Sequence, residues 1–79
     1  MYMPVILLTK NLKIYIYPKD HDPPHVHVIG PDSEAKFYIK TLECYLSYGF
    51  SKKDLNRISR FLEENIELLI EAWEEYHGE

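Results

Sequence analysis

Two histidines one residue apart are the strongest chemical signal in this sequence of 79 residues. Residues 25–29 read His-Val-His-Val-Ile, and this alternation predicts a strand on which His25 and His27 point to the same side. Imidazole changes its charge near neutral pH, so two neighbouring rings can accept and donate protons. We therefore expect His25 and His27, with Tyr15 and Tyr38 from adjacent strands, to be candidate catalytic residues. The reaction would be metal-free cleavage of RNA through its own 2′-hydroxyl group.

Further tyrosine and lysine side chains are predicted on the same face of the sheet. Tyrosines stack on bases and lysines contact phosphates, so binding without cleavage is a second interpretation. The candidate nucleic-acid-binding residues are Lys13, Tyr17, Lys36 and Lys40. A plainer interpretation is that tyrosine is simply a good strand former. The weak net charge of the strand half also disfavours tight, unassisted binding to nucleic acid.

A metal site is the third interpretation of the histidines. His21, His25 and His27 have the spacing H-x-x-x-H-x-H, and two histidines at i and i+2 can ligate one ion. Asp20 or Asp22 could add an oxygen ligand. The ion would be zinc or another divalent transition metal, whereas the two nucleic-acid interpretations need no cofactor.

Period-2 alternation over residues 5–47 predicts the strands that position these side chains. The inward positions are Leu12, Ile14 and Ile16 in one stretch and Ala35, Phe37 and Ile39 in another, which runs from Glu34 to Lys40. Leu42, Cys44 and Leu46 could face inward from a fifth short strand. Hairpin-length connections imply mainly antiparallel pairing.

Helical periodicity follows the strands. Apolar residues recur at steps of three or four between residues 52 and 77, which predicts an amphipathic helix or two helices broken near Glu64-Asn65. Ser51 and Asp54 resemble a capping box at the start of this segment. We expect Trp73 in the core, and His77 at the helix end, where a cation complements the helix dipole.

These patterns predict one α+β domain over residues 1–79, because a chain of this length allows no second domain. A four- or five-stranded, mainly antiparallel sheet would occupy residues 5–47. One or two C-terminal helices, at about 52–77, would pack on one face of it. We expect the two imidazoles on the opposite face, turned away from the helices.

Charge is divided unevenly along the chain. All nine Lys and Arg residues lie in residues 1–60, whereas seven of the thirteen acidic residues lie in 61–79. The acidic block is either a solvated helix face or a surface for a basic partner. One cysteine excludes a disulfide framework. No apolar run approaches the roughly 20 residues that span a bilayer, so we expect a cytoplasmic location and no membrane partner.

The residues HDPPHVHV at 21–28 resemble the hallmark of a small bacterial and archaeal family of domains of unknown function. The likeness extends from residue 3 to about 78 through Met3-Pro4-Val5-Ile6, Glu34-Ala35-Lys36, Gly49-Phe50-Ser51 and Glu71-Ala72-Trp73. The resemblance assigns no catalytic residue. It implies a genetic context, because such genes often lie beside a second small domain in pairs that look like toxin–antitoxin modules. A small partner protein encoded nearby is therefore expected.

The leading hypothesis is a toxin–antitoxin-like module that binds or cleaves nucleic acid, RNA in preference to DNA, through a sheet face of His, Tyr and Lys. The alternative from a different class is a non-enzymatic protein-interaction module, either antitoxin-like or forming a homodimer. A metal-binding protein is the third choice. The sequence leaves open whether the protein is an enzyme.

Overall fold

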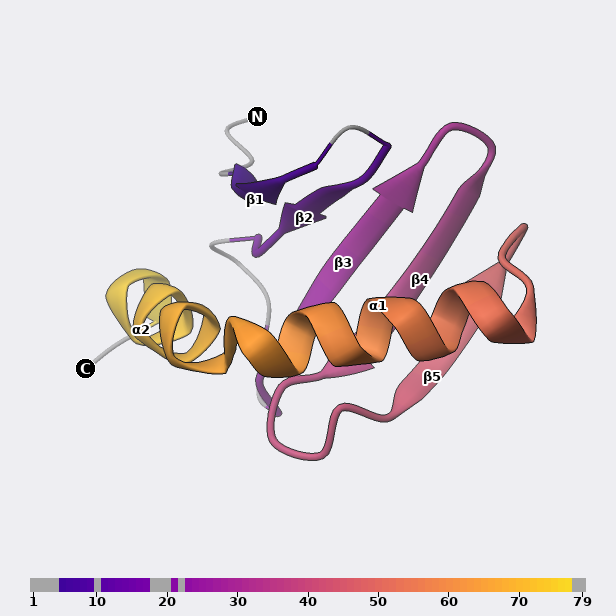
Figure 1. Cartoon of the computed structure of the whole chain (residues 1–79). Coiled ribbons are helices and arrows are strands. Elements are labelled where there is room, and N and C mark those ends of the chain that lie inside the picture. The colour runs from indigo at the N-terminus through magenta and orange to yellow at the C-terminus, as the bar shows by residue number, and fades with distance from the viewer. Residues whose placement is uncertain (1–4, 10, 18–20, 22, 78–79) are drawn as a thin grey trace.

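The structure is a computed structural model, and residues 5–9, 11–17, 21 and 23–77 are described. Five strands precede two helices along the chain (Figure 1). Their bounds are β1 Val5–Leu8, β2 Lys13–Tyr15, β3 His25–Gly30, β4 Ser33–Tyr38, β5 Cys44–Tyr48, α1 Lys52–Glu64 and α2 Ile66–His77. The strands pair antiparallel in the order β1-β2-β3-β4-β5, which confirms the predicted α+β class.

Alternate residues of the central strands fill the core beneath α1. Ile14 of β2 pairs with Val28 of β3, and Val28 pairs with Ala35 of β4. All three are buried and belong to one apolar cluster with Ile58 and Leu62 of α1. Aliphatic burial is the main stabilising contribution to a fold of this size, so this row fixes which face of the sheet α1 covers.

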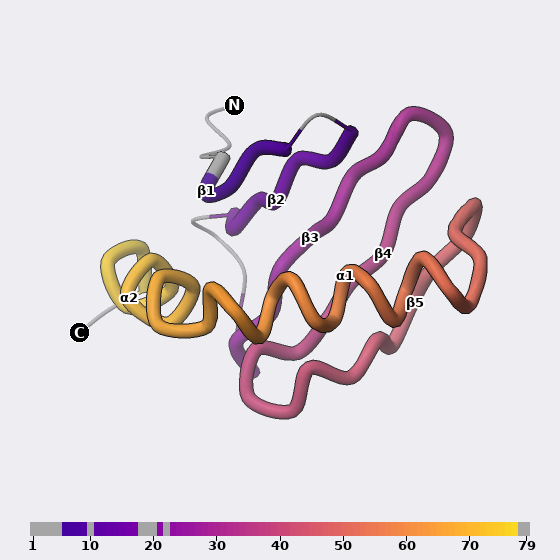
Figure 2. The backbone as a smooth tube through the Cα atoms, viewed as in Figure 1, coloured from indigo at the N-terminus to yellow at the C-terminus, as the bar shows by residue number. Residues whose placement is uncertain are grey.

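The two helices run in different directions. Figure 1 shows α1 crossing in front of the sheet and α2 seen almost end-on, and the tube in Figure 2 follows the same path. The break falls at Asn65, whose backbone leaves the helical region at φ −118° and ψ 24°. Its side-chain amide donates to the carbonyl oxygen of Phe61 at 2.9 Å and so closes the end of α1. Within the described residues neither helix is long and apolar enough to cross a membrane.

The start of α1 is fixed by hydrogen bonds that the sequence predicted. The backbone N–H of Asp54 donates to the Ser51 hydroxyl at 3.0 Å, and the N–H of Ser51 donates to the Asp54 carboxylate at 3.1 Å. This reciprocal pair satisfies two backbone donors at the helix end. Gly49 precedes it with φ 82°, and a Cβ there would lie 2.5 Å from the carbonyl oxygen of Asp32. Only glycine suits that position.

A β-bulge in β5 makes the inward prediction for Leu46 wrong. Cys44 pairs with Phe37, whereas Leu46 pairs with Lys36, so Tyr45 is an extra residue between the two pairs. An extra residue shifts the alternation by one. Leu46 therefore lies on the sheet face opposite α1, where it is exposed.

Strand β4 ends at Tyr38, two residues before the predicted end of the alternation. The chain then turns, and the N–H of Leu42 donates to the carbonyl oxygen of Tyr38 at 2.9 Å. Leu42 has φ 62° and lies outside the strands, which corrects its predicted place in a fifth strand. Lys40 lies in this turn and is exposed.

Candidate nucleic-acid interface

The sheet face opposite α1, called the outer face below, carries most of the predicted site residues. Tyr15 of β2 pairs with His27 of β3, and His27 pairs with Lys36 of β4. In the next row His25 pairs with Tyr38. Residues paired across antiparallel strands point to the same side of a sheet. The predicted parity of His25 and His27 is therefore confirmed.

Eight rings form a connected group that we call the ring cluster. Its members are Tyr15, Tyr17, His25, His27, Tyr38, Tyr45, Trp73 and His77. Each lies within 6.3 Å of another member, measured between ring centroids, which is the range of stacked and edge-to-face contacts. Strands β2 to β5 and helix α2 all contribute, so tertiary structure assembles the cluster.

His27 is the most enclosed member. Its side chain is only 4% exposed, although its polarity would favour solvent. Tyr17 stacks on it with centroids 4.1 Å apart and planes inclined by 17°, and the ring of His25 lies edge-on at 5.2 Å. A ring enclosed in this way has little surface for a substrate. We therefore interpret His27 as a packing residue that holds the rings of Tyr17 and His25 in place.

His25 is half-buried at the start of β3. Its Nδ1–H donates to the carbonyl oxygen of Pro23 at 2.9 Å, and because a carbonyl can only accept, this bond places the proton on Nδ1. In the neutral ring Nε2 is then the basic nitrogen. The fixed tautomer gives His25 one of the properties that a general base needs.

Helix α2 also reaches this histidine. The ring centroid of Trp73 lies 5.5 Å from that of His25. The sequence predicted that both imidazoles are turned away from the helices, and this contact with α2 corrects that prediction for His25. Trp73 is buried in the main core cluster, as predicted. Its ring stacks on His77 at 3.7 Å, and the Nδ1–H of His77 donates to the Trp73 carbonyl oxygen at 3.0 Å. That bond gives His77 the predicted place at the helix end.

Three residues of β5 that the sequence did not assign to the site lie on or beside the outer face. Tyr45 stacks on Tyr38 with centroids 4.3 Å apart and is 42% exposed. Leu46 and Tyr48 pair with outer-face residues of β4, and Tyr48 is 62% exposed. The only feature of the sequence that could have indicated a role of β5 in the site is the high tyrosine content of this stretch. The bulge that turns Tyr45 outward has no simple signature.

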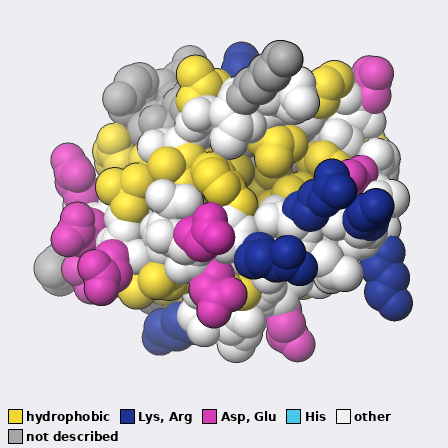
Figure 3. Space-filling view, viewed as in Figure 1, with side chains coloured by type: hydrophobic (Ala, Val, Ile, Leu, Met, Phe, Trp, Pro, Cys, Tyr) yellow, Lys and Arg dark blue, Asp and Glu magenta, His cyan; other side chains and the backbone are white. Residues whose placement is uncertain are grey.

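The predicted lysines are divided by the fold. Lys13 is exposed on the outer face, and Lys36 is half-buried there beside His27. Lys40 lies in the turn after β4 and belongs to neither row. On the opposite side, basic side chains gather over the start of α1 and acidic ones over α2, and none of the four histidines is visible in that view (Figure 3).

The predicted metal ligands are not assembled in the described part of the chain. His21 is exposed in the loop before β3, and Asp20 and Asp22 lie outside the described residues. Within those residues, no three His, Cys, Asp or Glu side chains could hold one ion. A zinc site formed by His21, His25 and His27 therefore has no support from this geometry.

The fold and the outer face define a small α+β domain with a five-stranded antiparallel sheet that gathers aromatic and imidazole rings on one side. The chain belongs to the family described as "Domain of unknown function (DUF4160)", whose model matches residues 11–74. That match covers most of the chain and confirms membership of a family of unknown function. No curated protein and no solved structure matches the chain.

Proposed function

We propose that this protein binds single-stranded nucleic acid, RNA in preference to DNA, on its outer face. One observation carries the proposal: strand register brings the rings of Tyr15, His27 and Tyr38 and the lysine Lys36 to the same side of the sheet. Single-stranded RNA is recognised by stacking of unpaired bases on aromatic rings, often on an open antiparallel sheet. Its 2′-hydroxyl offers tyrosine hydroxyls a hydrogen-bonding group that DNA lacks.

The ring cluster has the graded exposure that stacking needs. His27 is buried and supports its neighbours, whereas Tyr45 is 42% exposed and stacks on Tyr38. A ring held by a second ring loses little freedom when a base stacks on it, because its rotamer is already fixed. Tyr45 is thus the best-placed ring for a base.

The charges suit weak and selective binding. Lys13 and Lys36 are the lysines of the outer-face rows, whereas acidic residues gather over α2 in the view of the opposite side (Figure 3). Two phosphate contacts give a shallow dependence on salt, with a slope near −0.7 per contact for single strands. Stacking would therefore contribute more to the affinity than charge.

The test measures binding of a fluorescein-labelled octauridine by anisotropy. Tyr45→Ala should weaken binding about 5- to 150-fold, since one base–aromatic stack contributes about 1–3 kcal/mol. Tyr45→Phe is the matched control and should stay within about threefold of wild-type affinity, because it keeps the ring and loses only the hydroxyl group. Wild-type protein that binds no single strand, or equal affinity of Tyr45→Ala and wild type, would overturn the proposal.

RNA cleavage is a second candidate, favoured by the fixed tautomer of His25. Nε2 would take the 2′-hydroxyl proton, the 2′-oxygen would attack phosphorus, and the 5′-oxygen would leave with a proton from Tyr38, the cross-strand neighbour of His25. The product would carry a 2′,3′-cyclic phosphate. His25→Ala should abolish cleavage and keep binding within about threefold, and a 2′-deoxy substrate should resist cleavage. Absence of cyclic-phosphate product would leave binding as the function.

A non-enzymatic interaction module is the alternative, and β5 is the feature that favours it. This edge strand contains no charged residue and exposes Tyr45, Leu46 and Tyr48. Such an edge can pair with a second copy or with a small partner protein. A dimer by light scattering that Tyr48→Lys converts to monomer would favour this alternative. The toxin–antitoxin context is tested by growth after induction with and without the neighbouring gene.

A further inference from the structure

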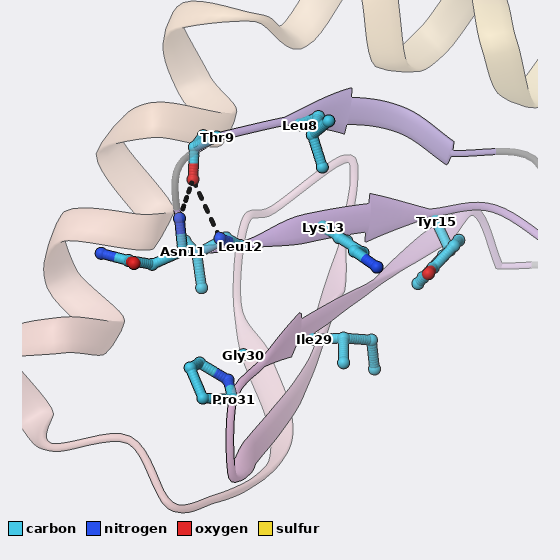
Figure 4. A pocket seen from close by; sticks show the side chains of 9 residues that line it. All are labelled: Leu8, Thr9, Asn11, Leu12, Lys13, Tyr15, Ile29, Gly30 and Pro31. Carbon is cyan, nitrogen blue, oxygen red and sulfur yellow. Dashed lines mark hydrogen bonds between the residues drawn. The ribbon is translucent and has the colours of Figure 1, made fainter.

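A groove of about 490 Å³ opens at the edge of the ring cluster, where the β1–β2 turn meets the β3–β4 turn (Figure 4). Six of the residues that line it are Leu8, Thr9, Asn11, Lys13, Tyr15 and Ile29. Tyr15 belongs to the groove and to the ring cluster, because its ring centroid lies 6.3 Å from that of Tyr17. The groove therefore extends the outer face.

Strand register confirms that the groove lies on the outer face. Leu8 pairs with Lys13, and Lys13 pairs with Ile29, so these side chains form a row beside the row of Tyr15 and His27. Figure 4 shows the side chains of Lys13 and Tyr15 next to each other along β2. One wall of the groove is thus formed by side chains from three adjacent strands, and Lys13 lies at the centre of this wall.

The groove combines the Lys13 cation, apolar side chains and a turn that is held by hydrogen bonds. Lys13 is exposed, and no carboxylate of the described residues forms an ion pair with it. Leu8 is 68% exposed and offers an apolar surface to a ligand. The Thr9 hydroxyl accepts the N–H groups of Asn11 and Leu12 at 3.3 and 3.0 Å and fixes the turn.

From this geometry we infer that the groove binds one nucleotide of the RNA strand, the one adjacent to the bases stacked on the ring cluster. Its phosphate lies on the Lys13 ammonium group, and its base lies against Leu8 and Ile29 beside the Tyr15 ring. The inference rests on the proposed function and adds a defined subsite to it. RNA-binding domains with a four-stranded sheet stack two or three bases on it. If the outer face binds a similar number, the groove extends the site to about four nucleotides.

A length series tests this subsite. Affinities of oligouridines of two to six nucleotides are measured by competition against the labelled octauridine. For the wild type, affinity should rise up to about four nucleotides and then change only by statistical factors. Lys13→Gln and Leu8→Ala should each weaken tetranucleotide binding about five- to tenfold and leave the dinucleotide within twofold. Both side chains are exposed, so the fold should tolerate these changes.

Lys53→Gln is the matched control, since Lys53 is exposed on α1 and does not line the groove, and its loss changes the net charge equally. It should leave every affinity within twofold. Equal effects of Lys13→Gln and Lys53→Gln, or an effect of Lys13→Gln that is the same at all lengths, would overturn the subsite and leave base stacking intact.

A second measurement separates failure of the subsite from failure of RNA binding. Uridine monophosphate is titrated into the protein while backbone amide shifts are followed. The amides of Asn11 and Gly30 should move, and they should stop moving in Lys13→Gln. If the wild type binds no oligonucleotide but these shifts occur, the groove is a mononucleotide site and the proposed function is wrong. If the wild type binds no oligonucleotide and the amide shifts do not occur, the proposed function and the subsite are both wrong.

Discussion

The two faces of the sheet are made by alternate residues of the same strands, yet they are filled in different ways. Beneath α1 the side chains are mostly aliphatic, and the aromatic Phe37 is the largest fully buried one. On the outer face many side chains are rings that carry polar atoms, and these rings are enclosed to very different degrees, from buried His27 to exposed Tyr48. The side chains beneath α1 have almost no polar atoms that need hydrogen-bond partners, whereas several side chains of the outer face have such atoms.

This difference separates stability from recognition. Aliphatic packing is non-directional and depends on filled volume, so any loss of volume beneath α1 weakens the whole fold. Rings that stack on each other keep open edges and faces for a ligand. Helix α2 connects the two regions, because Trp73 belongs to the core cluster and also contacts His25.

The largest expected effect comes from a cavity beneath α1. Phe37→Ala should lower the free energy of unfolding by about 3–5 kcal/mol, because a fully enclosed aromatic side chain is lost and the site cannot collapse. Urea unfolding followed by the single tryptophan measures this change. Tyr48→Ala is the matched control from the outer face and should change the unfolding free energy by less than about 0.5 kcal/mol. Equal effects of the two variants would remove the contrast between the faces.

A smaller effect is expected for His27, where ring and imidazole chemistry can be separated. His27→Ala should cost about 2 kcal/mol, since it removes a buried side chain on which Tyr17 stacks. His27→Phe keeps a ring of similar size and should cost less than about 1.5 kcal/mol. Octauridine affinity of His27→Phe should stay within threefold of wild type. A folded His27→Phe protein that no longer binds or cleaves RNA would show that the imidazole acts on the ligand directly.

The smallest effect tests whether the two faces are independent. Ser51→Ala removes the capping hydroxyl of α1 and should cost about 1 kcal/mol in unfolding free energy. RNA affinity should stay within twofold, because α1 lies on the opposite side of the sheet from the ring cluster. Ser47→Ala, at an exposed position of β5, serves as the control for stability. Weaker RNA binding in folded Ser51→Ala would mean that α1 contributes to the interface.

Local pattern predicted much of this molecule. Alternation in residues 25–29 was enough to place His25 and His27 together, because the period of a strand fixes the direction of each side chain. The capping box at Ser51 was predictable, since its hydrogen bonds join residues three apart. The break at Asn65 was one of two predicted alternatives, and the structure decides between them.

Non-local features were missed. The bulge at Tyr45 depends on how β5 pairs with β4, so the inward prediction for Leu46 was wrong and the exposed tyrosines of β5 were overlooked. The contact between Trp73 and His25 depends on the direction that α2 takes after its break. Neither feature has a period or a motif.

The sequence by itself determined the α+β class, the strand parity of the histidines and the start of α1, because each depends on residues close together in the chain. Only the tertiary structure decided which rings touch, how deeply His27 is enclosed, and that Lys13 lies in a groove with Leu8 and Ile29. The physical reason is that exposure and contact are properties of packing between distant segments. Alternation fixes the side of a strand on which a residue lies, and its neighbours on that side come from the fold.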